Sequence, residues 1–219
     1  MRNKSQYLYI FLLSFVLFTT ALWILKITRG NIPFVDQWTK EFVVALDDSY
    51  IYFIFRWITE LGSGTFLTPF TIIMGIVLWI IFRDWLVGVM FAGGTYLSNL
   101  LNVGIKHIVE RERPRILEGV EAHGSSFPSG HAMISLACYG LLVYFLSKKI
   151  KSEKAIIALQ ISASILIFLI GFSRYIIRVH YLTDVLAGFA FGFIFILLWT
   201  LLYEFIVEKR KRLGQPRQV

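Results

Sequence analysis

The sequence predicts an all-α fold: a polytopic membrane protein built as a six-transmembrane-helix bundle, with an amphipathic outer segment between the first two helices. Hydrophobic residues make up 57% of the 219-residue chain and the mean hydropathy is +0.67. Charged residues are only 16%, whereas a soluble domain has about 25%. Six apolar stretches are also long enough to cross a bilayer, which takes about 20 residues. We expect one integral-membrane domain over residues 1–219.

The predicted spans are joined by short polar connections, except after the first and the third. The first span begins like a signal peptide, with Arg2 and Lys4, but its apolar stretch is long and no small-residue cleavage site follows. We therefore expect it to remain as a transmembrane helix. The six spans are expected at Tyr7–Leu25, Thr65–Phe82, Trp85–Ile105, Pro128–Leu146, Ala155–Phe172 and Leu182–Val207.

The basic residues predict that both termini are cytoplasmic. Stretches 1–6, 83–84, 147–154 and 208–219 would share one side, and they hold more than half of the 22 Lys and Arg residues. Short loops rich in Lys and Arg stay in the cytoplasm, and contact with anionic lipid is a second use for such charge. No soluble module accompanies the charge, so nucleic-acid binding is not expected.

The outer side also carries basic residues. Segment 26–64 is amphipathic enough to lie in the membrane interface as one or two helices. Six further cations flank the later spans on this side: Lys106, Arg111, Arg113, Arg115, Arg174 and Arg178. Because this clustering opposes the topological trend, it indicates an anionic ligand.

Several single residues have structural interpretations. Cys138 is the only cysteine, which excludes an intrachain disulfide, and we expect it to pack as a small hydrophobic residue. Asn99 and Asn102 are expected to form interhelical hydrogen bonds, with ligand contact as the alternative. His123 matches no motif and is expected to be a solvated loop residue, with contact to a lipid headgroup as the alternative.

The first candidate motif is "KHIVERERP", residues 106–114. If the third helix continued to Arg113, the spacing would return Lys106 and Arg113 to one face, about 10 Å apart along the axis. Pro114 predicts that the helix stops there. Two cations on one face fit a multiply charged oxyanion, and a basic flank that snorkels to the interface is the alternative.

The second motif, Pro128-Ser129-Gly130-His131, stands at the head of the fourth span. Proline near the first helical position favours a helix start. Ser129 and Gly130 would then offer backbone N–H groups to an anion at the positive end of the helix. For His131 alone, a structural role at the helix end is the alternative.

The third motif contains His180 and Asp184, which are neighbours if both lie on one helix. A carboxylate bonded to one ring nitrogen fixes the tautomer and leaves the other nitrogen nucleophilic. Asp184 also begins the last span, where an unpaired carboxylate would be costly. Taken alone, a purely structural pair explains these two residues equally well.

Together the motifs fit phosphoryl transfer through a phosphohistidine. His180 would attack phosphorus and Asp184 would hold its tautomer. His131 would protonate the leaving oxygen and then activate water. No metal or other cofactor is expected, because three cations would neutralise the phosphoryl oxygens: Lys106, Arg113 and Arg174.

The motif set resembles that of the type-2 phosphatidic acid phosphatase superfamily, which comprises lipid phosphate phosphatases and soluble vanadium haloperoxidases. All motifs are complete and in order, and the resemblance covers roughly residues 50–205. The six spans resemble the membrane branch. The motifs are Lys106-x6-Arg113-Pro114, Pro128-Ser129-Gly130-His131 and Ser173-Arg174-x5-His180-x3-Asp184.

The resemblance implies a metal-independent lipid phosphatase with its site at the outer face of the cell membrane. It implies that His180 is the nucleophile, Asp184 its partner and His131 the acid and base. The expected partners are the bilayer and a membrane lipid phosphate: phosphatidylglycerophosphate, or alternatively phosphatidic acid or undecaprenyl diphosphate. The implied phosphate-binding residues are Lys106, Arg113, Ser129, Gly130, His131 and Arg174.

Two other functions use the same cations. A phospholipid transporter or flippase would hold a phosphate group, but transporters place their sites near the bilayer midplane, whereas these charges lie at span ends. A haloperoxidase-like oxidant is the other alternative, although those relatives are soluble.

Overall fold

The computed structural model describes residues 2–44, 49–114 and 124–213. These residues form eight α-helices and one short 3-10 helix, with no strand among them. The elements are α1 (Arg2–Thr28), α2 (Phe34–Val44), α3 (Tyr50–Ile58), η1 (Thr59–Gly62), α4 (Gly64–Phe82), α5 (Trp85–Val109), α6 (Gly130–Ser147), α7 (Glu153–Ile176) and α8 (Leu182–Leu213).

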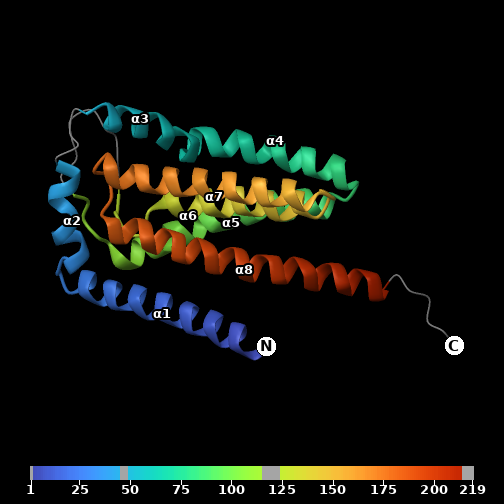
Figure 1. Ribbon diagram of the computed structural model, residues 1–219, viewed down its shortest axis with the longest axis horizontal. Helices are drawn as coiled ribbons and strands as arrows, with labels where there is room; N and C mark the ends of the chain where they lie inside the picture. Colours follow the sequence, from blue (N-terminus) through green and yellow to red (C-terminus); the bar gives the residue numbers. More distant parts are fainter. Residues whose placement is uncertain (1, 45–48, 115–123, 214–219) are drawn as a thin grey trace.

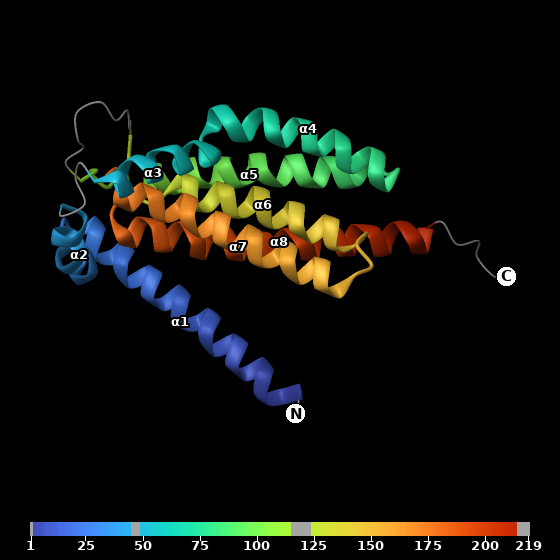
Figure 2. The same cartoon turned by 45° about the horizontal axis from the view of Figure 1, so that its top comes forward.

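The predicted all-α membrane bundle is confirmed. Within the described residues, six helices are long and apolar enough to cross a bilayer, namely α1 and α4 to α8. They run lengthwise along the molecule, and α1 diverges from the others toward its N-terminus (Figures 1 and 2). Helices α2 and α3 form the expected segment between the first two spans, and α2 lies across one end of the bundle (Figure 1). We call this the α2 end.

Local capping explains where the helices turn. Arg83 adopts a left-handed conformation (φ 53°) after α4, and the Asp84 side chain accepts a hydrogen bond from the Leu86 N–H at the start of α5. Such a side-chain acceptor satisfies a backbone donor that has no partner within the helix. The tight turn therefore sets α4 and α5 side by side in opposite directions.

The core lies around α6, which contacts α5, α7 and α8. Phe91, Leu141, Phe145 and Ile170 are fully buried there. Gly188 brings α8 against the start of α6, because a β-carbon at this position would lie 2.7 Å from the Ser129 carbonyl oxygen. This close approach positions the first turns of both helices next to each other.

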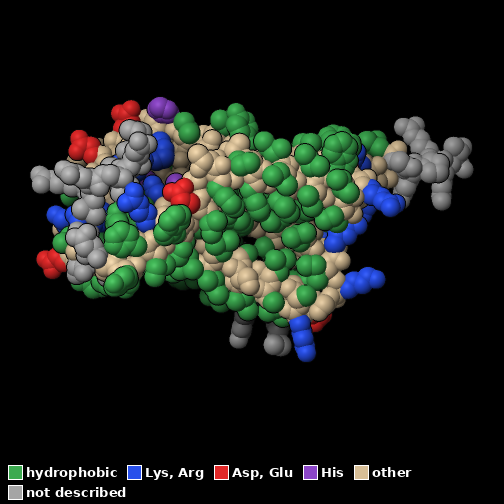
Figure 3. All heavy atoms as spheres, turned by 90° about the horizontal axis from the view of Figure 1, so that it is seen from above, with side chains coloured by type: hydrophobic (Ala, Val, Ile, Leu, Met, Phe, Trp, Pro, Cys, Tyr) green, Lys and Arg blue, Asp and Glu red, His purple; other side chains and the backbone are tan. Residues whose placement is uncertain are grey.

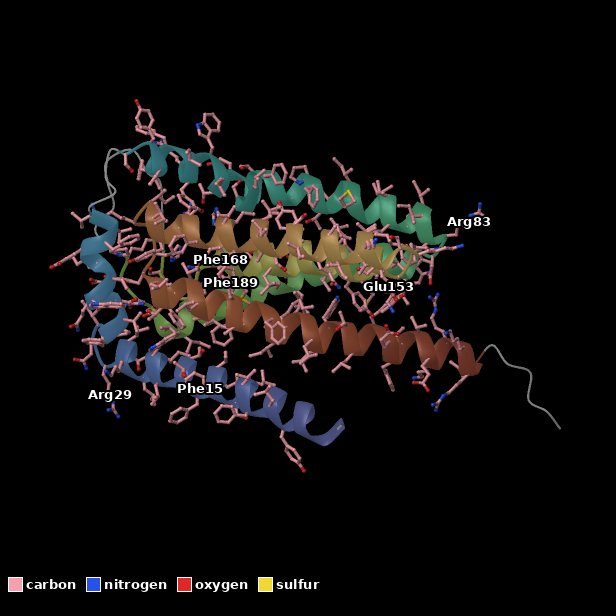
Figure 4. All side chains as sticks on the ribbon, viewed as in Figure 1. Phe15, Arg29, Arg83, Glu153, Phe168 and Phe189 are labelled. Atoms are coloured by element: carbon pink, nitrogen blue, oxygen red, sulfur yellow. The ribbon has the colours of Figure 1, made fainter. Side chains whose placement is uncertain are left out.

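The surface separates apolar from charged side chains. Figure 3 shows a broad hydrophobic band along the middle of the molecule, with Lys and Arg gathered at its two ends. Arg29 lies at the α2 end, whereas Arg83 and Glu153 lie at the opposite end (Figure 4). This distribution is typical of a protein whose middle part is surrounded by the hydrocarbon core of a bilayer.

Candidate active site

The three sequence motifs meet at the α2 end of the bundle. Helices α5 and α7 run toward this end, and α6 and α8 start from it (Figure 1). The end of α5, the turn before α6 and the turn between α7 and α8 are therefore neighbours. The antiparallel order of the spans accounts for this meeting of residues that are distant in sequence.

His180 and Asp184 form the centre of the site. His180 lies in the turn before α8, so the two residues do not share a helix as the spacing argument assumed. Their side chains still meet, with His180 Nδ1 3.4 Å from Asp184 Oδ2. His180 Nε2 lies 3.3 Å from Arg113 Nη1. Because a guanidinium can only donate, Nε2 is the acceptor and the proton resides on Nδ1, which leaves a lone pair on Nε2.

The Asp184 carboxylate is buried and surrounded by donors. Ser126 Oγ donates to Oδ2 at 2.5 Å and the Tyr181 N–H donates to the same oxygen at 2.9 Å. Arg111 Nη1 donates to Oδ1 at 2.5 Å. Ser126 Oγ also lies 3.3 Å from His180 Nδ1. A carboxylate held by so many donors keeps its charge and its orientation, and it can fix the imidazole tautomer.

Arg111 and Asp36 complete this arrangement. From the sequence, Arg111 was counted only among the outer cations, without a role of its own, and Asp36 was not singled out. Arg111 Nη2 donates to Asp36 Oδ2 at 2.7 Å, and its guanidinium stacks 3.8 Å from the centre of the Tyr181 ring. Asp36 accepts two further hydrogen bonds from Thr183, through the N–H at 3.0 Å and the hydroxyl at 2.6 Å. Both charged side chains are buried. The outer helix α2 is thereby tied to the first turn of α8.

The three cations predicted to bind phosphate also lie at this end of the bundle. Lys106 Nζ donates to the Ser125 carbonyl oxygen at 2.5 Å, and Arg113 Nε donates to the Gly124 carbonyl oxygen at 3.0 Å. Arg174 Nη1 donates to Thr59 Oγ1 at 2.9 Å, whereas its buried Nε has no hydrogen-bond partner among the described residues. A buried donor without a partner is costly, and an oxyanion bound there would supply one.

Helix α5 ends earlier than the first motif suggested. It stops at Val109 because Glu110 adopts a left-handed conformation (φ 46°). The expectation that the helix reaches Arg113 was therefore wrong, and helical spacing does not bring Lys106 and Arg113 together. They are aligned instead by segment 124–126, whose carbonyl groups accept from both side chains and whose Ser126 N–H donates to the Arg111 carbonyl oxygen at 2.7 Å.

The second motif starts α6 at Gly130. Ser129 caps the helix, since its Oγ accepts from the Ala132 N–H at 3.5 Å, but its own N–H donates to the Asp184 carbonyl oxygen at 2.9 Å. The helix end can therefore offer an anion the N–H groups that follow, beginning at Gly130. Asn102 forms an interhelical hydrogen bond of the expected kind, because its amide nitrogen donates to Met133 Sδ in α6 at 3.7 Å. The same amide donates to the Pro128 carbonyl oxygen, just before α6, at 3.4 Å.

His131 is partly exposed on the first turn of α6. Its ring lies against η1, where a β-carbon on Gly62 would come within 3.0 Å of His131 Cδ2. The charges that act on its ring include those of Arg174 and His180. The histidine that opens α6 thus belongs to the same site as the pair at the start of α8.

Burial controls the charge of the imidazole in the turn before α8. Removal from water lowers the pKa of His180 from 6.5 to about 3, and the neighbouring Asp184 carboxylate opposes this shift only in part. Burial also lowers the pKa of Arg113. His180 is therefore neutral at physiological pH, as a nitrogen nucleophile must be.

A pocket of about 640 Å³ opens beside the imidazole, between α2 and the turn that precedes α8. Its lining includes Arg113 and His180 together with Lys40 from α2. Among the described residues, no group of three or more His, Cys, Asp or Glu could hold a metal ion. His123 and Arg115 lie outside the described residues.

Comparisons with known proteins identify the family. The family model described as "PAP2 superfamily" matches residues 85–208. The chain is 32% identical over 184 residues to phosphatidylglycerophosphatase B of Bacillus subtilis (strain 168), covering 82% of this chain and 87% of that protein. It is 28% identical over 182 residues to a dolichyldiphosphatase of Saccharomyces cerevisiae, covering 78% and 74%.

Solved structures show the same fold. The crystal structure of a transmembrane PAP2 type phosphatidylglycerolphosphate phosphatase from Bacillus subtilis matches with a TM-score of 0.75 at 28% identity, over 86% of this chain and 96% of that one. The crystal structure of Aquifex aeolicus LpxE matches with a TM-score of 0.57 at 22% identity, over 73% and 90%, and this second likeness concerns the fold alone.

Proposed function

Because the chain belongs to the PAP2 superfamily, we propose that it is an integral-membrane lipid phosphatase that hydrolyses the terminal phosphate of phosphatidylglycerophosphate or a related phospholipid. The observation that carries the proposal is the neutral His180, with Nε2 as the acceptor nitrogen and Asp184 behind Nδ1. The likeness to phosphatidylglycerophosphatase B supports the choice of substrate. Residues 1–219 would act as one phosphatase domain.

In the proposed reaction, His180 Nε2 attacks phosphorus as the bond from phosphorus to the lipid oxygen breaks. His131 gives its proton to that leaving oxygen. In the second step, His131 takes a proton from water, the resulting hydroxide attacks phosphorus, and the bond between Nε2 and phosphorus breaks to release inorganic phosphate. Asp184 stabilises the imidazole while it carries positive charge.

The proposed transition state needs neutralisation of the phosphoryl oxygens. Lys106, Arg113 and Arg174 would bind them, with the N–H groups of Gly130 and His131 at the positive end of α6. The unpartnered Nε of Arg174 supports this role. These donors would neutralise the negative charge on the phosphoryl oxygens, as a metal ion does in other phosphatases. We therefore propose a metal-independent reaction.

We also propose that the site faces the outside of the cell and that both termini are cytoplasmic. The connections at the end opposite α2 are short and rich in Lys and Arg, which is typical of the cytoplasmic side. A lipid could then present its phosphate to the site while its acyl chains stay in the outer leaflet.

The test is phosphate release by the purified protein in detergent from three lipids: phosphatidylglycerophosphate, phosphatidic acid and undecaprenyl diphosphate. We expect the highest kcat/KM for phosphatidylglycerophosphate, inhibition by vanadate, and no loss of activity with EDTA. His180→Ala should abolish turnover. Full activity in His180→Ala would overturn the mechanism, and lipid movement across a vesicle membrane without phosphate release would favour a transporter.

A further inference from the structure

The pocket beside His180 is larger than the reacting phosphate requires. Its volume of about 640 Å³ falls within the range of about 300–1,000 Å³ that is typical of sites for whole small molecules. The cations that serve the terminal phosphate lie on α5, on α7 and in the segment after α5. The part of the pocket under α2 is therefore available for another portion of the substrate.

Two further cations line this part of the pocket. Lys40 comes from α2, and Arg178 comes from the turn between α7 and α8. Arg178 holds a left-handed backbone conformation (φ 62°) just after the end of α7, as residues that terminate a helix often do. Neither side chain is needed for the proposed chemistry at phosphorus.

The acidic residue in the lining is already bound by other residues of the site. Asp36 Oδ2 accepts from Arg111 and from the Thr183 hydroxyl, and its Oδ1 accepts from the Thr183 N–H. Its negative charge is thus paired with the Arg111 guanidinium within the buried network. The polar lining that a ligand would meet there includes Lys40 and Arg178, with Gln37 as a neutral hydrogen-bonding neighbour.

We propose that Lys40 and Arg178 bind a second anionic group of the substrate, a phosphodiester or a second phosphate, and so favour lipids with two phosphate groups over lipids with one. This inference rests on the proposed function, because it assigns the remainder of the same substrate. Lys40, Arg178 and His180 line the same pocket. One headgroup can therefore contact the two cations while its terminal phosphate meets His180. A charge-assisted hydrogen bond to phosphate is strong enough to discriminate between substrates.

The experiment compares kcat/KM for phosphatidic acid, phosphatidylglycerophosphate and a prenyl diphosphate. The first has one phosphate, the second adds a phosphodiester, and the third adds a directly linked phosphate. We expect Lys40→Gln and Arg178→Gln each to lower kcat/KM for at least one lipid with two phosphates about tenfold more than for phosphatidic acid. The lipid that is affected identifies the second group.

Arg29→Gln is the matched control. Arg29 is exposed at the same end of the molecule, and its side chain points away from the other helices (Figure 4). This variant removes the same charge but should leave all three values within about twofold. Equal losses for the three lipids in Lys40→Gln and Arg178→Gln, or losses matched by Arg29→Gln, would overturn the inference. Absence of phosphate release from the unsubstituted protein would instead overturn the proposed function.

Discussion

Asp36 in α2 and Asp184 at the start of α8 bind the same guanidinium. Arg111 reaches Asp184 through Nη1 at 2.5 Å and Asp36 through Nη2 at 2.7 Å. All three side chains are buried. The carboxylate that orients the proposed nucleophile therefore depends on a cation that an outer helix helps to hold. This dependence makes α2 part of the site and not only a cover for it.

Removing the shared cation should cost more than removing one of its partners. Arg111→Met leaves two buried carboxylates without a counter-charge, so we expect a loss of about 3–5 kcal/mol in the free energy of unfolding. Asp36→Asn should cost less, about 1–3 kcal/mol. Chemical unfolding of the detergent-solubilised variants, followed by circular dichroism, measures both values.

The double variant provides the decisive comparison. Adding Asp36→Asn to Arg111→Met removes one of the two uncompensated charges, so the double variant should be more stable than the sum of the single losses predicts. The catalytic rate of Arg111→Met should also fall, because Asp184 is no longer held. Strict additivity of the two losses would show that Arg111 does not couple Asp36 to Asp184.

The spans were predictable because each is a long apolar run, and the three motifs meet because antiparallel spans bring their ends together. Arg111 and Asp36 were not predictable in the same way. Arg111 looked like one more basic residue in an outer cluster, and Asp36 lies in an amphipathic helix with no local pattern to separate it from solvent-facing acids. Their ion pair is a tertiary contact between segments distant in sequence, so no spacing in the sequence predicts it.

Two pairs of site residues were expected to share a helix, but in each pair one residue lies outside it. The seven-residue spacing of Lys106 and Arg113 suggested a shared helical face, yet α5 ends at Val109. His180 and Asp184 meet although His180 precedes α8. In both cases a loop supplies the missing geometry. Segment 124–126 aligns the two cations through its carbonyl groups.

Asp184→Asn should separate orientation from binding. The amide keeps the size of the side chain but loses the negative charge that holds the proton on His180 Nδ1. We expect kcat to fall by about 10²–10⁴-fold, as for other carboxylates that orient a catalytic imidazole, while KM changes little. Steady-state kinetics measure both quantities. A rise in KM with unchanged kcat would assign Asp184 to substrate binding instead.

The lowered pKa of His180 predicts how the site responds to acid. Protonation would remove the lone pair from Nε2, so loss of the nucleophile should occur near pH 3 and not near 6.5. In NMR spectra of the protein with labelled histidine, the His180 signal should keep the shift of a neutral imidazole at pH 5. The His180→Asn variant identifies that signal. A midpoint close to 6.5 would contradict the prediction.

The same pKa has a consequence for stability. Between pH 6.5 and about 3, the unfolded chain binds a proton at this histidine that the folded chain does not bind. The stability associated with His180 should therefore fall as the pH decreases from 6.5. When the pH is lowered to 5, the unfolding free energy of the unsubstituted protein should decrease by about 2 kcal/mol more than that of His180→Asn. Equal pH dependence of the two proteins would show that His180 titrates alike in both states.

Gly62 tests whether η1 positions His131. A β-carbon at this residue would lie 2.3 Å from Ile170 Cγ2, 2.9 Å from Ser135 Oγ and 3.0 Å from His131 Cδ2. Ile170 belongs to the packed core, so Gly62→Ala must shift η1 or displace the histidine. We expect a loss of about 1–3 kcal/mol in unfolding free energy together with reduced kcat.

Gly64→Ala, two residues further on, is the control for that variant. A β-carbon there would meet no atom within 4 Å, and alanine suits the first turn of α4 better than glycine. This variant should therefore be neutral or slightly stabilising, by up to about 1 kcal/mol, with kcat unchanged. If Gly62→Ala lost stability but kept full kcat, the contact would serve packing alone and His131 would be positioned by α6 itself.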